Sequence, residues 1–287
     1  LADSYADVYG EYAQYDFDLA RWFSMDRDLP RALYSSFALT HGTFGLSLEY
    51  KDYERFAFST LNNPPPLIRE HESYLLNRDT HEMLADDETG AQVELSYGFP
   101  GGQMLTGNYT TYRRRGNPGR SDDMRSWELF LQADIPLGSQ VDGQLFADYN
   151  RDRSFNDEHR RTLGANAEWA LFHWAWHGDL QFQDVNRRFG RERLPYRNLY
   201  LTLGLERSPS RSWSVILQRS TDELERGADV SGTTYWWGGN LNWELRDGRN
   251  LNLFAGKRRP GLACTGGTCY EVLGFEGLEM RLVSRVF

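Results

Sequence analysis

The sequence predicts an all-β protein: a transmembrane antiparallel up-and-down β-barrel of about 14 strands, with short periplasmic turns and long extracellular loops. Three observations lead to this prediction. Segments are apolar at every second residue, tight turns alternate with long polar connections, and aromatic residues are abundant. In the segment 198–206, for example, the leucines are Leu199, Leu201, Leu203 and Leu205. A strand has a period of two residues, so these leucines share one face, which can meet hydrocarbon while the other face stays in water.

The composition is compatible with a barrel although it resembles that of a soluble protein. Hydrophobic residues make up 40% of the chain and the mean hydropathy is −0.65. The longest apolar run, 169–176, is far shorter than the roughly 20 residues that cross a bilayer as a helix. In a barrel only half of each strand faces lipid, and the 16 Tyr, 16 Phe and 9 Trp can supply interfacial girdles. A soluble β-sandwich or jelly roll also alternates. The long strands and the one-sided placement of long loops favour the barrel.

The strands are expected in the following order along the chain. We expect them at residues 5–18, 30–41, 44–57, 90–99, 103–115, 124–136, 140–153, 157–171, 173–187, 196–207, 211–222, 230–244, 249–258 and 274–287. Gly, Pro, Asp and Ser mark nearly all the connections after even-numbered strands, as hairpin turns require: 41–43, 99–102, 137–139, 172–173, 208–210 and 246–249. The other connections are long, notably 58–89, 116–123, 188–195, 223–229 and 259–273.

The predicted lipid face is consistent from strand to strand. Its members are Leu46, Leu48, Tyr50, Val93, Leu95, Tyr97, Trp127, Leu129, Leu131, Ile135, Trp213, Val215, Leu217, Trp237, Leu241, Trp243 and Leu245. The opposite register would place Glu128, Gln132 and Asp134 in lipid, at a cost of several kcal/mol per charge near the midplane. An even number of strands also lets the first strand pair with the last, which leaves no open edge.

The last residues, 278–287, end in Phe287 and resemble the C-terminal signature strand of outer-membrane barrels, which the insertion machinery reads. The segment Asn62–His71, with its Asn-Asn-Pro-Pro-Pro start, and the loop that carries Cys264 and Cys269 resemble those of an uncharacterised family of bacterial outer-membrane barrels. The resemblance implies the barrel fold and a location in the bacterial outer membrane, and no established activity. Residues 1–287 are expected to form one barrel domain. Because the sequence begins at Leu1 and family members tend to be longer, the alternative that it is the C-terminal part of a longer barrel stays open.

Cys264 and Cys269 flank a Gly-rich tip in the sequence Cys-Thr-Gly-Gly-Thr-Cys. This spacing favours a local disulfide in an oxidising compartment. A metal site would need more ligands than this neighbourhood supplies, and no haem-attachment motif is present. We therefore expect no metal and no cofactor.

Charges on the expected lumen side are sorted by depth. Carboxylates lie toward the periplasm, and we expect an acidic wall that favours cations. The residues proposed for selectivity are Glu128, Asp134, Asp142, Asp148, Glu168 and Asp179, opposed by Arg281. The alternative is structural: such charges also form salt bridges that fill a barrel. Basic residues gather at the outer strand ends, where Arg113, Arg114, Arg187 and Arg188 are expected to contact lipid headgroups, or else to be ordinary solvated charges.

The connection 58–89 is longer than loops without a function usually are. Pro64, Pro65 and Pro66 stiffen its start, Arg69 and His71 follow, and Tyr74-Leu75-Leu76 has apolar side chains to bury in an amphipathic turn. We expect this loop to cross the pore as a constriction. A partner-binding or merely mobile surface loop is the alternative.

These features predict an outer-membrane channel for small polar solutes or ions, with a polar, acidic-walled lumen. The alternative is a non-conducting structural or anchoring barrel of a larger cell-envelope complex, with partner proteins in that complex. Outer-membrane lipid, lipopolysaccharide and the barrel-insertion machinery are the other expected partners. An enzyme is not expected, because no serine lies in a recognisable nucleophile context. Nucleic-acid binding is disfavoured by the net charge of −9.

Overall fold

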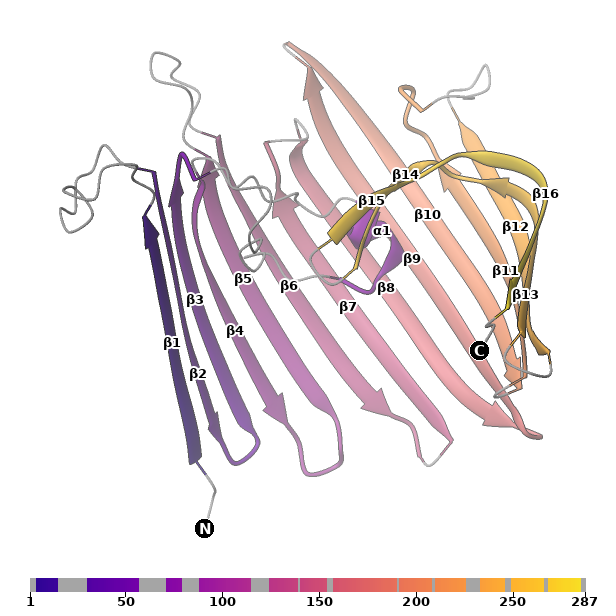
Figure 1. Ribbon diagram of the computed structural model, residues 1–287, viewed down its shortest axis with the longest axis horizontal. Helices are drawn as coiled ribbons and strands as arrows, with labels where there is room; N and C mark the ends of the chain where they lie inside the picture. Colours follow the sequence, from indigo (N-terminus) through magenta and orange to yellow (C-terminus); the bar gives the residue numbers. More distant parts are fainter. Residues whose placement is uncertain are drawn as a thin grey trace.

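The computed structural model describes residues 4–14, 30–56, 71–78, 88–114, 124–138, 140–153, 157–189, 191–207, 210–225, 233–245, 249–265 and 268–284. Fourteen strands form a single antiparallel sheet in which each strand pairs with its neighbour in sequence, from β1 to β13 and then β16 (Figure 1). A separate two-stranded hairpin, β14–β15, and one short helix, α1, lie over one face of that sheet. The predicted all-β, up-and-down architecture with 14 strands is confirmed.

The strands agree with the expected order. Their bounds are β1 Ser4–Gln14, β2 Arg31–His41, β3 Phe44–Glu54, β4 Glu88–Gly98, β5 Met104–Arg114, β6 Met124–Pro136, β7 Val141–Arg151, β8 Asp157–Leu171, β9 Trp174–Phe189, β10 Glu192–Arg207, β11 Arg211–Ser220, β12 Thr234–Leu245, β13 Arg249–Arg258, β14 Gly261–Thr265, β15 Thr268–Val272 and β16 Phe275–Ser284; α1 is Tyr74–Arg78.

Short turns lie at one end of the sheet, called here the short-turn end, as the sequence predicts. At Phe172 and His173 both residues have positive φ, 51° and 66°, as a two-residue hairpin turn demands. The opposite end, called the loop end, carries the long connections, with one exception. The expected loop 188–195 is wrong, because β9 and β10 continue in register as far as Phe189 and Glu192. Paired backbone hydrogen bonds extend these two strands past the point where the apolar alternation ends.

One face of the sheet, called the outer face, is apolar and exposed. Leu131 is 48% exposed, Val215 55% and Trp237 58%, and the neighbouring predicted lipid-face residues share that face. The opposite, inner face carries α1. Its buried positions include Thr110, Thr162, Gln181 and Gln183. The alternation therefore separates an apolar outer face from a polar inner face, and the predicted register is confirmed.

Aromatic side chains mark both ends of the outer face. At the short-turn end Trp169 stacks on Trp176, with ring centroids 6.0 Å apart. At the loop end Trp127 and Tyr149 meet edge to face at 5.0 Å. Trp and Tyr prefer the interface between hydrocarbon and water, so two such girdles are the expected borders of an apolar band.

Glycines allow the sheet to curve where aromatic rings and strands approach closely. Gly238, Gly256 and Gly277 form a row across β12, β13 and β16. Gly256 has φ +142°, and a Cβ there would lie 2.2 Å from the carbonyl oxygen of Trp237. Such a row introduces a bend that residues with side chains would resist. In Figure 1 the strands curl over at this end of the sheet.

The two sheet edges are β1 and β16, which lie far apart in Figure 1. Among the described residues no pairing joins these strands, so closure by the first and last strands stays a prediction. Within the same residues, no helix is long and apolar enough to cross a membrane.

Candidate functional site

The described part of the long connection, residues 71–78, lies on the inner face and is called the inner segment. It begins at His71, which is 4% exposed. A hydrogen bond of 2.6 Å joins His71 Nε2 to Glu128 Oε1, and the His71 ring lies over Phe130 with centroids 4.5 Å apart. Glu128 and Phe130 are two residues apart on β6, so strand periodicity places both on the inner face. One strand therefore supplies both the polar and the aromatic contact for His71.

The helix α1 follows and buries its apolar side chains against the sheet. Leu75 and Leu76 are 1% and 2% exposed, and Leu76 packs with Phe130 and Phe146. Each buried leucine contributes roughly 1.5–3 kcal/mol. Within this helical turn, the backbone N of Asn77 donates a 2.9 Å hydrogen bond to the carbonyl oxygen of Ser73. These apolar contacts hold α1 against the inner face of the sheet.

Two further contacts fix the position of α1 against β9 and β10. The backbone N of Leu75 donates a 2.8 Å hydrogen bond to Gln181 Oε1. The Tyr74 ring stacks on the Tyr200 ring, with centroids 4.3 Å apart and planes inclined by 11°. The sequence marks Tyr74–Leu76 as a turn with apolar side chains, but nothing in it points to Gln181 or Tyr200, because these contacts depend on which strands lie opposite the loop.

A second connection reaches the inner segment. Arg78 donates hydrogen bonds to the Tyr74 hydroxyl, at 3.3 Å, and to the carbonyl oxygen of Pro260, just before the β14–β15 hairpin. The expected loop 259–273 contains this hairpin, which the sequence pattern does not reveal. Its register places Cys264 opposite Cys269. The side chains of these cysteines lie outside the described residues, so the disulfide stays a prediction.

Below α1, toward the short-turn end, lies a cavity of about 650 Å³, called the acidic cavity. Four predicted selectivity residues line it, one each from β6, β7, β8 and β9. They are Asp134, Asp142, Glu168 and Asp179. Glu72 of the inner segment adds a fifth carboxylate, and neither Arg nor Lys is among the lining residues.

A row of hydrogen bonds across three strands fixes side chains that line the acidic cavity. Asp134 accepts from the amides of Gln132 and Gln144, at 3.0 and 2.9 Å. Gln144 in turn accepts from Asn166 at 2.8 Å. Amides hold the Asp134 carboxylate in place without neutralising its charge. A concave wall of unneutralised carboxylates in a low-dielectric surrounding focuses a negative potential.

Two of the predicted selectivity carboxylates lie elsewhere. Glu128 is 6% exposed and bonded to His71, while Asp148 is 4% exposed and accepts from Asn150 Nδ2 at 2.9 Å. Both belong to the packed region beside α1 rather than to the acidic cavity. The expectation that Arg281 opposes the carboxylates is wrong, because Arg281 forms its ion pair with Glu279 on its own strand, β16.

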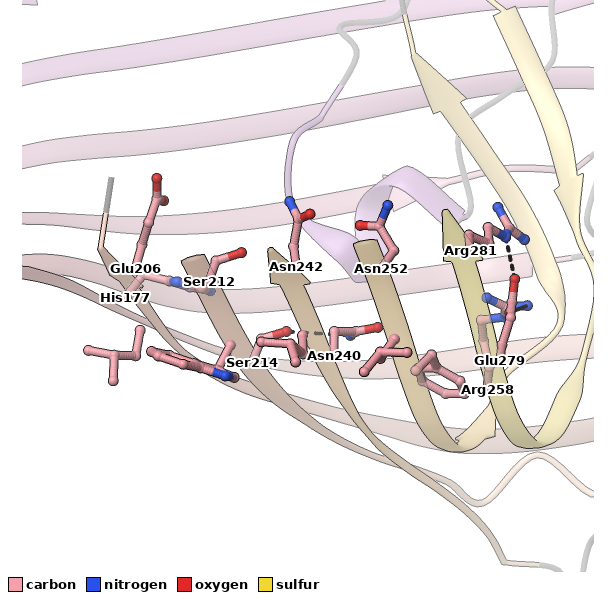
Figure 2. A pocket seen from close by; sticks show the side chains of 15 residues that line it. His177, Glu206, Ser212, Ser214, Asn240, Asn242, Asn252, Arg258, Glu279 and Arg281 are labelled. Carbon is pink, nitrogen blue, oxygen red and sulfur yellow. Dashed lines mark hydrogen bonds and ion pairs between the residues drawn. The ribbon is translucent and has the colours of Figure 1, made fainter. Parts of the chain in front are cut away.

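The inner face of β11, β12 and β13 carries mainly neutral polar side chains, with Glu244 near its short-turn end. A cavity of about 520 Å³ there, called the neutral cavity, is drawn in Figure 2. Hydroxyl and amide side chains project from the adjacent strands, and Arg281 and Glu279 lie at the edge (Figure 2). These polar neutral residues are Ser212, Ser214, Asn240, Asn242 and Asn252. Glu279 is also 3.2 Å from Arg258, so the charges at this edge are paired. Glu206 lines the opposite side of the cavity (Figure 2).

Two arginines at the loop end of the inner face are paired with carboxylates. Arg187 pairs with Asp222 at 2.8 Å and donates to the Tyr196 hydroxyl at 2.8 Å. Arg259 pairs with Glu225, its Nε lying 3.0 Å from Oε1. Both carboxylates come from the short segment after β11. The placement of Arg187 at the lipid headgroups is therefore wrong, since its guanidinium points inward.

The other residues proposed for headgroup contact divide between the faces. Arg114 shares the inner face with Tyr112, two residues before it, which is 5% exposed. Arg113 and Arg188 alternate with inward residues, lie on the outer face and are exposed. Of the expected loop-constriction residues, Pro64, Pro65, Pro66 and Arg69 lie outside the described residues.

Within the described ranges, no group of three or more His, Cys, Asp or Glu side chains could hold a metal ion.

Two solved structures from Pseudomonas aeruginosa are similar to the chain. OpdO shares 15% identity at a TM-score of 0.40, over 89% of this chain and 81% of OpdO. OccK11 (OpdR) shares 13% identity at a TM-score of 0.35, over 89% of this chain and 90% of that protein. No protein-family model and no curated protein matches the sequence. The function must therefore be read from the side chains of this chain itself.

Proposed function

We propose that this chain is an outer-membrane channel for small polar solutes or ions, narrowed by the inner segment and favouring cations. The placement in an outer membrane follows from the apolar outer face, the two aromatic girdles and a polar inner face. The short-turn end then faces the periplasm and the loop end faces outward. The barrel-insertion machinery would read the final strand.

The observation that carries the proposal is the position of the acidic cavity directly beside α1. A solute that passes the inner segment enters a space lined by carboxylates from four successive strands. Each of these carboxylates projects from a strand rather than from a loop, so its position is rigid. Glu72 brings one more carboxylate from the constricting segment itself. Such a wall raises the local concentration of cations and repels anions.

Single-channel conductance of the refolded chain in a planar bilayer, with a salt gradient, tests the proposal. Discrete steps and a reversal potential of the sign expected for cations are the predicted result. Asp134→Asn with Glu168→Gln should move the reversal potential toward zero. The matched control, Glu192→Gln with Glu223→Gln, removes the same charge from exposed residues at the loop end and should leave the reversal potential unchanged.

A second function is favoured by one specific observation. The inner face around α1 is filled, and Thr110, Thr162, Gln181 and Gln183 are all 0% exposed. A filled interior suits a structural or anchoring subunit of a larger envelope assembly, with protein partners in that assembly. A folded barrel that never conducts, even after the inner segment has been released, would favour this function over the channel.

A further inference from the structure

The outer face carries a cavity at the loop end, between β9, β10 and β11. It measures about 470 Å³ and is called the outer groove. Apolar and basic side chains line it together: Phe182 and Leu199, 43% and 42% exposed, lie beside Arg197 and Arg219. The groove thus differs from the purely apolar surface of the outer face and from the polar inner face.

The strand register orders these residues into two adjacent rows. In the row nearer the loop end, Arg161, Asp184 and Arg197 lie side by side on β8, β9 and β10. In the next row toward the short-turn end, Leu199 of β10 pairs with Arg219 of β11. Neighbouring strands are about 4.8 Å apart, so the guanidinium groups of Arg197 and Arg219, which lie on adjacent strands, can reach one headgroup. Arg161 lies two strands away from Arg197, at the margin of the groove.

The three arginines are held in place but not neutralised as a set. Arg197 Nε is 3.1 Å from Asp184 Oδ1. Arg161 lies over the Tyr149 ring at 5.4 Å, and Arg219 over the Tyr235 ring at 5.9 Å. Aromatic faces orient a guanidinium without removing its charge. The charged residues that line the groove, Arg197, Arg219 and Asp184, have a net charge of +1 at neutral pH, and Arg161 adds a further positive charge at its margin.

Along the strand direction, the outer groove lies at the loop-end border of the apolar band on the outer face. Toward the short-turn end from these arginines the outer face is apolar, with Leu163 59%, Leu203 55% and Leu217 48% exposed. Arg188, which also lies on the outer face, is farther toward the loop end. Side chains that suit acyl chains therefore lie directly beneath side chains that suit an anionic headgroup.

We propose that the outer groove binds a phosphorylated glycolipid of the outer leaflet, with a phosphate on Arg197 and Arg219 and acyl chains along Phe182 and Leu199. The inference rests on the outer-membrane placement proposed above and does not depend on conduction. A phosphate monoester carries about −1.5 to −2 charge at neutral pH, which is opposite in sign to the net positive charge of the groove and its margin. Guanidinium groups bind phosphate bidentately. A zwitterionic phospholipid fits less well, because its ammonium group would face the same arginines.

Native mass spectrometry of the full chain, folded in detergent micelles, tests this inference. A bis-phosphorylated lipid A, the same lipid without phosphates, and phosphatidylethanolamine are titrated in parallel. We expect the phosphorylated form to bind the unaltered chain at least about tenfold more tightly than either of the others. Arg197→Gln with Arg219→Gln should remove that advantage.

Arg211→Gln provides a matched control. Arg211 lies on the same strand and face as Arg219, also over an aromatic ring, Trp243 at 4.6 Å, but at the short-turn end. Its loss should leave lipid binding unchanged.

Three results would overturn the proposal. They are equal binding of the phosphorylated and dephosphorylated lipids, an equal loss of binding in the Arg211 variant, and displacement of the lipid by inorganic phosphate at a similar concentration. The last result would identify a site for free phosphate instead. If the double variant does not fold, the comparison of the three lipids on the unaltered chain still tests the proposal. A chain that binds the lipid but never conducts would disprove only the proposed channel function. A chain that conducts but shows no preference among the lipids would disprove only the proposed lipid site in the outer groove.

Discussion

The two halves of the inner face have similar strands and similar polarity but different contents. The wall formed by β6 to β10 holds α1 and the acidic cavity, while the wall formed by β11, β12, β13 and β16 holds the neutral cavity and paired charges. The difference follows from where aromatic side chains point inward. Phe130, Phe146 and Tyr200 provide a surface for α1 on the first wall. On the second, Phe254 packs over Gly238 instead.

A polar inner face therefore need not be uniform in charge. On the first wall Asp134 and Asp179 accept hydrogen bonds from side-chain amides, whereas on the second Glu279 forms ion pairs with Arg258 and Arg281. A solute that crosses the inner face would therefore be selected on one wall only. Four changes would break or sharpen this contrast.

The largest effect is expected from Leu75→Asp with Leu76→Asp. Both side chains are almost fully buried, and an unpaired buried charge costs several kcal/mol. The inner segment should leave the first wall, and the conductance should rise severalfold in planar bilayers. Leu224→Asp changes an apolar residue that is 54% exposed, and serves as control. An unchanged conductance in the double variant would show that α1 does not narrow the path.

The next effect concerns the contact that begins the inner segment. His71→Ala removes the partner of Glu128 and leaves a buried carboxylate without its hydrogen bond, which should cost about 1–3 kcal/mol of unfolding free energy. Urea unfolding from lipid vesicles measures this loss. His41→Ala is the control, because His41 is exposed and bonds only to Ser4 at 2.7 Å among the hydrogen bonds described for it. Equal small losses in both variants would contradict a structural role for the buried pair.

The second wall depends on its glycine row. Gly256→Ala places a methyl group against the Trp237 carbonyl in an unfavourable backbone conformation, and should cost on the order of 1–3 kcal/mol in the same unfolding measurement. Gly10→Ala adds a methyl group with nothing within 4 Å of its Cβ, so its effect should be negligible. A stable Gly256 variant would show that the bend does not need this row.

The smallest effect should come from making the neutral wall resemble the acidic one. Asn242→Asp with Asn252→Asp, introduced into the Asp134→Asn, Glu168→Gln background, should restore part of the cation preference. The restoration is partial because the neighbouring arginines Arg258 and Arg281 attract the new carboxylates. The reversal potential under a salt gradient measures it. Full restoration would mean that the net lumen charge, rather than the wall that carries it, sets selectivity.

The sequence by itself determined the fourteen strands of the main sheet, their order and the face on which most of their residues lie. Period-two alternation is a local property, so Leu131 and Val215 could be assigned to the outer face from their neighbours alone. The same alternation placed Asp134, Asp142, Glu168 and Asp179 on the inner face. It also marked Tyr74–Leu76 as apolar side chains within a polar connection.

Only the tertiary structure decided which inner-face groups meet. The contacts of His71 with Glu128, of Leu75 with Gln181 and of Tyr74 with Tyr200 join residues far apart in sequence, and no local pattern specifies such pairs. The same limit explains the wrong placement of Arg281 and Arg187, because a charged side chain takes the nearest partner that the fold presents. Periodicity fixes the direction of a side chain, whereas its partner depends on the curvature of the sheet and on where the long connection folds back.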